Sequence, residues 1–490
     1  MEDEPKLIDI IKFFDENIKE SMGCTDPAAI ALAVSAAFNA IKGRLPMNYL
    51  TKKLDLPPRK IREEIENITV KTDRGIFKNA LQVGITRTNG LKGTNNAAAL
   101  GVFCDPGKSL ELFEDLSEEK ILEATNLIKE EKVEVIPNYE WEERRIEAEV
   151  TTKDSMGIAY IDKEQSNIAY IEVDGKPKFE KPKTKDEAEK LESLHELSDF
   201  IEIIEEDLPR EVNGKSAKTR IEEAIRTNHK ASLIAERGFS ELDRKSVGLG
   251  IKNLMTEGYL GGDYIDLAEE KVSLATEGRM AGLDIRVLTC ARSGNMGLVV
   301  TLPLIAVALS ELKKQCPEYD ISWDSATEVI QKRTPENWER LIKAVGLAYL
   351  IANYVGIYSG KMSASCGCGT KAGVGVAAGI AYYLTPADDK DKVGIIGQAI
   401  NNMAGSIIGM ICDGAKRGCA LKTAAATRAA MESALLAYTG FGLSDSDGIT
   451  HQDAMITLQR IGAISKEMER ANRKIIEFLQ DIPPSKYSRD

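Results

Sequence analysis

Residues 174–192, DGKPKFEKPKTKDEAEKLE, divide this chain, because they are polar, charged and nearly free of large apolar side chains. Such a composition is typical of a linker or a surface insertion, since it cannot bury enough apolar surface to form a core. The part of the chain before this stretch contains both helix-like and strand-like patterns. From about residue 193 onward the pattern is helical and rich in Ala and Gly. The sequence therefore predicts an α+β protein with a mixed α/β domain over 1–175, a charged linker over 176–220 and an all-helical domain over 221–490.

The spacing of apolar residues predicts the helices and strands on either side of this charged stretch. Residues 7–18 have helical spacing, and Asp26-Pro27 is typical of an N-cap followed by a first-turn proline, which predicts a helix over 28–42. A last long helix is predicted over 453–480, ended by Pro483-Pro484. Strands are predicted at Ile68–Thr72, Leu81–Ile85, Val133–Ile136, Ile146–Thr152, Ile158–Ile161 and Ile168–Val173, the last two as a hairpin.

The length, charge and apolar runs of the chain argue against nucleic-acid and membrane partners. The chain has 490 residues and a formal net charge of −13. Such a surface repels phosphate backbones, so no nucleic-acid partner is expected. The apolar runs Met296–Leu309 and Val345–Ile357 are shorter than the ~18 residues of a membrane span, which predicts buried helices and no membrane contact. Residues 1–6 are charged and suggest no signal peptide, so a cytoplasmic location is expected.

The chain has eight cysteines and three histidines. In a reducing cytosol, metal-binding or catalytic thiols are more common than disulfides. None of the histidines stands in a His-x-x-x-His or Glu-x-x-His pattern, which gives little support to a His-rich zinc or di-iron site. The cysteines are Cys24, Cys104, Cys290, Cys316, Cys366, Cys368, Cys412 and Cys419.

Two glycine-rich stretches hold half of these thiols. Ser363–Gly379, SASCGCGTKAGVGVAAG, has two cysteines two residues apart, and Asn401–Lys422 has Cys412 and Cys419 seven apart. Gly414 and Gly418 are expected to break the helix between them, which would let both thiols turn toward one point.

Three thiolates can hold an iron–sulfur cluster that leaves one iron open as a Lewis acid. Cys412 and Cys419 would supply two of them, and Cys366 or Cys368 the third. Buried cysteines also pack as small hydrophobic side chains, and a zinc site is a competing interpretation.

Four more segments carry groups that could meet a substrate, and the first two of them stand before predicted helices. In SGNMG, residues 293–297, the backbone N–H groups at the helix start could bind a carboxylate, although a plain N-cap is the commoner role. Cys24 precedes a helix, where the pKa of a thiol can fall, so it is a candidate base or ligand, or simply a buried cap residue. Lys78 and Lys92 could meet a substrate carboxylate, but such lysines are more often solvated.

Taken in order, six motifs resemble the L-cysteine desulfidase family, which is grouped with the iron–sulfur L-serine dehydratases. The resemblance extends from about residue 7 to 475. The motifs are GCTDPAAIALA from residue 23, FKNALQVGI at 77–85, GLKGTNNAAALG at 90–101, SGNMG at 293–297, SASCGCGTKAGVGVAAGIAYYL at 363–384 and GMICDGAKRGCALK at 409–422.

This resemblance implies a carbon–sulfur lyase with an oxygen-labile [4Fe–4S] cluster that converts L-cysteine and water to sulfide, ammonia and pyruvate. By motif, Cys412 and Cys419 correspond to two cluster ligands, and Cys366 is taken as the third with Cys368 as the alternative. Cys24 corresponds to the proposed proton acceptor. In the mechanism expected for this family, Ser293 and Asn295 hold the carboxylate or amine of the substrate.

Two alternatives stay open. The first is an iron–sulfur dehydratase that acts on L-serine with the same site residues. The second is a non-catalytic iron–sulfur or zinc protein, such as a sensor or a binding module. The SGNMG motif has Met296 where the family more often has Gln, which bears on the choice of substrate. The sequence leaves the oligomeric state open, a homo-oligomer included.

Overall fold

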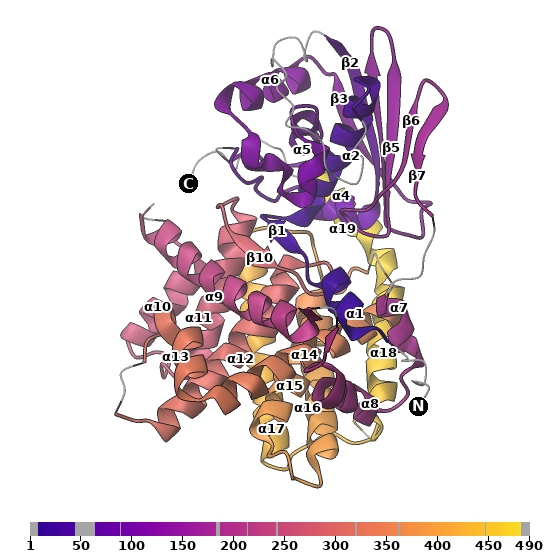
Figure 1. The fold of residues 1–490 in the computed structure, drawn as a ribbon. Coiled ribbons are helices and arrows are strands. Elements are labelled where there is room, and N and C mark those ends of the chain that lie inside the picture. The colour runs from indigo at the N-terminus through magenta and orange to yellow at the C-terminus, as the bar shows by residue number, and fades with distance from the viewer. Residues whose placement is uncertain are drawn as a thin grey trace.

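Figure 1 shows an α/β body, made by the described residues of 25–182 and 471–481, and a helical body, made by the described residues of 8–22 and 187–467. The first six residues, Pro483-Pro484 and positions 183–186 of the charged stretch lie outside the described residues. The computed structural model describes residues 8–44, 64–88, 90–182, 187–212, 214–241, 244–318, 321–360, 363–445 and 447–481.

A six-stranded sheet forms the α/β body. Its strands are β2 (Ile65–Asp73), β3 (Val133–Asn138), β4 (Arg145–Thr152), β5 (Met156–Asp162), β6 (Ile168–Val173) and β7 (Lys176–Glu180). Their order is β3-β2-β4-β5-β6-β7. β2 and β3 are parallel, and the other neighbouring pairs are antiparallel, which confirms the predicted β5–β6 hairpin. Buried and half-buried residues alternate along β4 and β5, as expected when one face covers the core.

The Ala-rich helix α2 (Thr25–Ile41) packs across β4, β5 and β6. A Cβ on Gly157 would lie 2.4 Å from the carbonyl oxygen of Ala37, so glycine at this position in β5 permits the close approach. The helix begins at Thr25, earlier than the predicted residue 28, and its N-cap is Cys24 rather than Asp26. Among the described residues, the other α-helices of this body are α4 (Arg74–Ala80), α5 (Thr94–Gly101), α6 (Glu118–Lys129) and α19 (Ala471–Gln480).

Helices dominate the rest of the chain, which confirms the predicted α+β class. The longer ones are α9 (Ala217–Glu241), α10 (Val247–Thr256), α11 (Tyr264–Met280), α12 (Gly294–Gln315), α14 (Pro335–Tyr358), α15 (Val374–Leu384), α16 (Lys392–Ile407), α17 (Cys419–Tyr438) and α18 (Ala454–Glu467). α11 packs against α9, α10, α12 and α17, and most of its residues from Asp266 to Met280 are buried.

The two apolar runs become α12 and α14. By length and composition alone either helix could cross a membrane, but 89% and 78% of their most apolar windows are buried inside the protein. This confirms the prediction that both are core helices. The short helices of this body are α1 (Ile10–Asn17), α7 (Glu187–Lys190), α8 (Leu197–Glu202) and α13 (Ala326–Arg333).

The chain crosses between the two bodies at both ends. α1 joins the hydrophobic cluster of the helical body, and β1 (Glu20–Met22) pairs antiparallel with β10 (Arg286–Leu288), a short strand among the helices. The chain then enters α2, whose N-cap is Cys24, so Cys24 lies at this crossing. At the other end, Ile476 of α19 packs into the hydrophobic cluster of the α/β body. The domain boundaries expected from the sequence stay a prediction.

Three predicted elements were wrong in detail. Residues 81–85 form no strand, because the N–H of Gly84 donates to the carbonyl of Met280 and this segment packs against the end of α11. The long C-terminal helix is broken by a 3-10 turn at Met468–Arg470, after which α19 turns to the α/β body. Within the expected linker, Lys176–Glu180 form β7, an exposed edge strand whose Lys and Pro residues are typical of protected edges.

Candidate functional site

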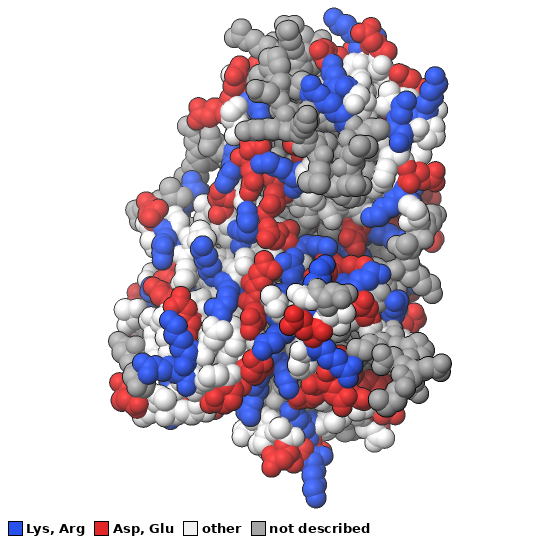
Figure 2. Space-filling model, in the orientation of Figure 1, with Lys and Arg blue, Asp and Glu red and all other residues white. Residues whose placement is uncertain are grey.

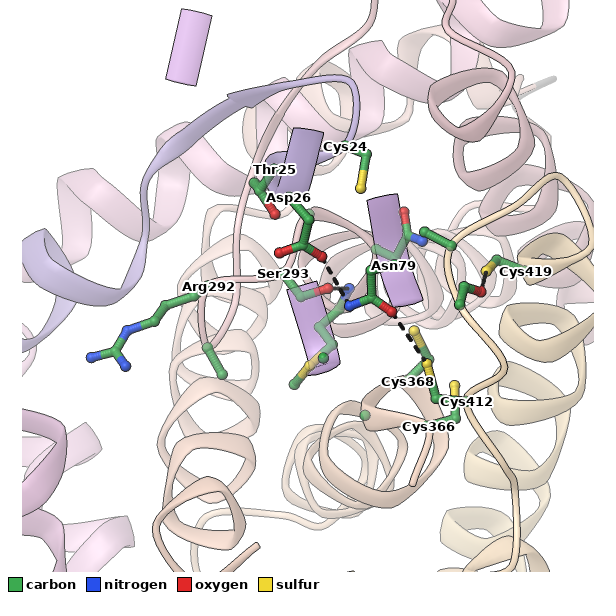
Figure 3. A pocket seen from close by; sticks show the side chains of 18 of the residues that line it. Cys24, Thr25, Asp26, Asn79, Arg292, Ser293, Cys366, Cys368, Cys412 and Cys419 are labelled. Atoms are coloured by element: carbon green, nitrogen blue, oxygen red, sulfur yellow. Dashed lines mark hydrogen bonds between the residues drawn. The ribbon is translucent and has the colours of Figure 1, made fainter. Parts of the chain in front are cut away.

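A pocket of about 190 Å³ lies where the two bodies meet, and both contribute to its walls. Figure 3 shows Cys24 facing the sulfur atoms of Cys366, Cys368 and Cys412 across it, with Cys419 to one side. The structure thus brings together the proposed ligands, the proposed base and the two SGNMG residues that the sequence singled out for chemistry. Those lining the pocket are Cys24, Ser293, Asn295, Cys366, Cys368, Cys412 and Cys419.

Backbone hydrogen bonds hold the Cys366 turn beside Cys412. The N–H of Cys366 donates to the carbonyl of Met410 at 2.8 Å, and the N–H of Cys412 donates to the carbonyl of Ala364 at 2.6 Å. This short antiparallel bridge joins two segments that are about 45 residues apart in the sequence. The two glycine-rich stretches therefore act as one structural unit.

A loop separates Cys412 from Cys419, as the glycines predicted. α16 ends at Ile407, α17 begins at Cys419, and Gly414 between them has φ +93°. A Cβ at Gly414 would also lie 2.7 Å from the carbonyl oxygen of Lys78, so glycine is needed both for its backbone conformation and for this contact. The Sγ of Cys419 lies 3.6 Å from the carbonyl oxygen of Gly414, which keeps this thiol against the loop.

The two cysteines of the CGC segment differ in charge state. A hydrogen bond from the Cys368 thiol lowers the pKa of Cys366 to about 6 despite burial, and N–H groups of Cys368 and Gly369 add to the effect. The same bond and burial raise the pKa of Cys368 well above its usual value. Cys366 is therefore the thiolate of the pair at neutral pH, and Cys368 is the donor.

Cys24 does not have the low pKa expected at a helix start. Burial, followed by the charge of Asp26, raises the pKa of its thiol well above the usual 9.0. The N–H of Asp26 and the guanidinium of Arg279 oppose this shift but do not offset it. The free thiol is thus the resting form of Cys24.

The SGNMG loop caps α12. The Ser293 hydroxyl accepts from the N–H of Met296 at 3.4 Å, so its N-cap role is confirmed. The Oδ1 of Asn295 accepts a hydrogen bond from Arg279, and its Nδ2 lies 3.6 Å from the sulfur of Met280. Both side chains line the pocket, but each already has a protein partner.

Arg279, at the end of α11, was missed by sequence reasoning. Its side chain is 1% exposed, and it donates to the carbonyl of Gly23 and the side chain of Asn295, so it joins the Cys24 loop to the SGNMG loop. A Cβ on Gly294 would lie 2.3 Å from its Nη2, which explains the glycine there. Burial lowers the pKa of Arg279 to about 10, and the Cys24 thiol is the first of the groups that counteract this.

Lys78 is buried, not solvated as expected. Its Nζ donates to the carbonyl of Cys412 at 2.9 Å and to Oδ1 of Asn472 at 2.7 Å. Next to it, Asn79 donates to Asp26 at 2.9 Å and lies 3.9 Å from the Sγ of Cys412 (Figure 3). These contacts tie α4 and α19 to the Cys412 loop. Lys92 does not line the pocket.

The pocket walls are strongly basic, although the whole chain is acidic. Among the described residues, five cationic side chains line the pocket and one carboxylate does so, that of Asp26. The amino termini of α2, α12 and α17, at Cys24, Ser293 and Cys419, add positive partial charge. On the outer face in Figure 2, Lys and Arg instead alternate with Asp and Glu. The five cations are Lys78, Arg144, Arg279, Arg292 and Lys371.

The sequence contained a signal for Lys371, which is the only charged residue in Ser363–Gly379. Arg279 gave no such signal, because it follows several other charged residues in α11, and a charge at helical spacing is usually solvated. Only the packing of α11 against α9, α10, α12 and α17 shows that this guanidinium is buried.

The donor set fits an iron–sulfur cluster. Four cysteines line one side of the pocket, and one of them has a lowered pKa. Among the described residues, no three His, Cys, Asp or Glu side chains approach closely enough to share a single metal ion. In a cluster each thiolate binds a different iron, so its ligands need not converge on one atom. The arrangement of thiols therefore suits a cluster better than a mononuclear zinc site.

Comparison with known proteins now assigns the family. Residues 107–477 match the family of the serine dehydratase alpha chain. This chain belongs to that family. The match includes the SGNMG loop and the four cysteines from Cys366 to Cys419, while Cys24 and Lys78 precede it.

Relatives of this chain align over nearly its whole length. A UPF0597 protein of Clostridioides difficile (strain 630) is 30% identical over 471 residues, covering 95% of this chain and 97% of the relative. A UPF0597 protein of Clostridium tetani (strain Massachusetts / E88) is 31% identical over 492 residues, covering 98% and 99%. Another, from Caldanaerobacter subterraneus subsp. tengcongensis, is 31% identical over 482 residues, covering 96% and 97%.

Membership of the serine dehydratase alpha chain family supports a lyase of the dehydratase type and an iron–sulfur cofactor, and leaves the cluster type and the substrate open. The burial of α12 and α14 agrees with a soluble protein. The cytoplasmic location and the partners expected from the sequence stay predictions.

Proposed function

We propose that this protein is an L-cysteine desulfidase, which eliminates sulfide from L-cysteine with the help of a [4Fe–4S] cluster. The observation that carries the proposal is the convergence of Cys366, Cys412 and Cys419 on one basic pocket, with Cys24 facing them (Figure 3). Family membership supports elimination from a small amino acid.

Cys366, Cys412 and Cys419 would hold the cluster. Cys366 is preferred over Cys368 because its backbone N–H is bonded to Met410 in the Cys412 loop, and the hydrogen bond from the Cys368 thiol also lowers the pKa of Cys366. When bound, a cluster with one iron not held by protein supplies a Lewis acid for the substrate's carboxylate or leaving group. The Cys412 loop is fixed for this task by Lys78 and by the bridge to the CGC segment.

Residues of the chain itself would remove the Cα proton and hold the substrate. Cys24, as a thiolate, accepts the proton from Cα of L-cysteine, and the electron pair of that bond expels hydrosulfide from Cβ. The resulting aminoacrylate leaves, tautomerises to an imine and reacts with water to give pyruvate and ammonia. Ser293 and Asn295, at the positive end of α12, hold the substrate, and Arg279 keeps Asn295 and the Gly23–Cys24 backbone in place.

One wall of the pocket favours a thiol over a hydroxyl group. Met280 and Met296 line it, and the sulfur of Met296 would lie 2.8 Å from a Cβ on Gly367 in the CGC segment. A thioether is soft and apolar and cannot satisfy a substrate hydroxyl as an amide would. L-Serine remains the second candidate, because the matched family is that of the serine dehydratase alpha chain.

Assays with both amino acids test the choice of substrate. We expect anaerobically reconstituted protein to release sulfide and pyruvate from L-cysteine with kcat/KM at least about 10-fold above that for pyruvate release from L-serine, a range that pocket contacts can supply. Replacement of Met296 by Gln should narrow this ratio, while Met255→Gln, on α10 and outside the pocket, should leave it unchanged. A preference for L-serine in the unmodified protein would overturn the desulfidase assignment.

A further inference from the structure

Asp26 is a pocket side chain that the mechanism above does not use. It lies in the first turn of α2, two residues after Cys24, and the residue is only 5% exposed. A carboxylate in a first helical turn often does no more than interact with the helix dipole. Here the side chain also lines the pocket, so it can reach a bound ligand.

Two amide groups hold this carboxylate in place. The Nδ2 of Asn79 in α4 donates to its Oδ2 at 2.9 Å, and the Nε2 of Gln165, in the turn between β5 and β6, donates to its Oδ1 at 3.3 Å. Asn79 also lies 3.9 Å from the Sγ of Cys412, so Figure 3 shows a line of contacts from Asp26 to Cys412. The carboxylate is thus fixed relative to the thiols that would hold the cluster.

These partners leave the carboxylate able to bind a cation. A carboxylate has about four lone-pair positions, and each oxygen of Asp26 accepts one hydrogen bond from a neutral amide. Among the described residues, no Lys or Arg side chain lies within ion-pair distance of Asp26. A buried anion without a cationic partner costs free energy, and a bound cation would offset that cost.

The other charges around the pocket leave Asp26 as the site for a cationic group. Asp73 lies behind the wall, because it caps α4 through the N–H groups of Gly75 and Ile76 and does not line the pocket. The five pocket cations would repel an ammonium group. The thiolates would attract one, but in the proposed function they bind iron, which takes up their negative charge.

We propose that Asp26 binds the ammonium group of the substrate. The inference rests on the proposed function for the identity of that substrate, a short L-2-amino acid. It assigns the two charged groups of the amino acid to different walls, because the SGNMG loop at the positive end of α12 keeps the carboxylate. Acids of the same size that lack the amine would therefore be poor ligands.

This placement also brings Cα toward the base. The ammonium nitrogen is bonded to Cα, and Cys24 belongs to the same turn as Asp26. Two groups held on opposite sides of Cα limit its rotation, so its proton stays directed at the thiol. Burial and then the charge of Asp26 raise the pKa of Cys24, and a bound ammonium group would offset the second of these effects.

Binding of two unreactive ligands tests this subsite without turnover. L-Alanine has both charged groups of L-cysteine but no leaving group on Cβ, and propionate differs from it only in lacking the amine. Calorimetry with the full-length, anaerobically reconstituted protein would compare the two. We expect the unmodified protein to bind L-alanine at least about 10-fold more tightly, as for a hydrogen bond between charged groups. Asp26→Asn should abolish this preference by weakening L-alanine alone, and Asp26→Glu should retain most of it.

Glu118→Gln is the matched control, because it removes one negative charge from the first turn of α6 and does not line the pocket. It should keep the preference for L-alanine. If Asp26→Asn weakens both ligands equally, so that the preference survives, Asp26 has only a structural role and the subsite is wrong. Absence of the preference in the unmodified protein would also overturn it. If Asp26→Asn does not fold, loss of the preference in Asp26→Glu would count against the subsite.

The outcome is separable from the proposed function. A preference for L-alanine that depends on Asp26, in a protein that releases no sulfide from L-cysteine, would support the subsite and refute the desulfidase assignment. Sulfide release by a protein that lacks this preference would do the reverse.

Discussion

Replacing Cys412 or Cys419 by Ala is expected to remove both the iron and the activity. Each thiol lines the pocket, and neither has a neighbouring cysteine in sequence that could replace it. Losing a Lewis acid that contributes several kcal/mol corresponds to a decrease in kcat/KM of at least about 100-fold. Iron content per chain and sulfide release, both measured anaerobically, check the result.

A comparison of Cys366 with Cys368 tests which cysteine of the CGC segment is the third ligand. Cys366→Ala should behave like Cys412→Ala, whereas Cys368→Ala should keep its iron, because Cys366 carries the lowered pKa. Cys104→Ala is the control, since Cys104 is buried in the α/β body, donates to the carbonyl of Leu100 and does not line the pocket. It should cost only about 1 kcal/mol of stability. Retained iron and full turnover in Cys412→Ala or Cys419→Ala would refute the ligand assignment.

Cys24→Ala is expected to keep the cluster but to lose turnover. Cys24 faces the other thiols across the pocket (Figure 3), in a position to reach a substrate between them. Removing a general base costs about 10²- to 10⁴-fold in rate. Iron content and kcat distinguish the two effects, and Cys316→Ala, which lies outside the pocket at the end of α12, serves as the control. Loss of iron in Cys24→Ala would make Cys24 a ligand and not a base.

Because the pKa of Cys24 is raised, the rate of the reaction should depend on pH. The base acts as a thiolate, and burial with Asp26 raises its pKa above the usual 9.0, so the active form increases as the pH rises. We therefore expect kcat/KM to rise with pH up to at least the usual thiol pKa, with no plateau near neutrality. A profile that is flat from neutral pH upwards would show that another group takes the proton.

Much of the fold was predictable because its signals are local. The β5–β6 hairpin followed from two β-rich runs around a polar turn, and the break between Cys412 and Cys419 followed from Gly414 and Gly418. The edge strand β7 was missed because Lys and Pro, which protect an edge, also resemble a linker. The break at Met468–Arg470 was missed because the helical spacing continues across it.

The site was predictable only in part. Cysteines and glycines in short motifs are conspicuous, so the thiols could be found from the sequence. The burial of Lys78 and Arg279 depends on contacts with residues more than 200 positions away, such as Cys412 and Gly23, and no local pattern encodes these. The pKa of Cys24 was predicted in the wrong direction, because desolvation by the surrounding pocket outweighs the helix terminus.

Mössbauer spectroscopy, with and without L-cysteine, of protein reconstituted anaerobically with enriched iron would show whether these thiols hold a cluster that has one open iron. We expect about four irons per chain in one [4Fe–4S] cluster, and the signal of a single iron should change when L-cysteine binds. A protein that holds no cluster, or a cluster in which L-cysteine alters none of the irons, would contradict this expectation.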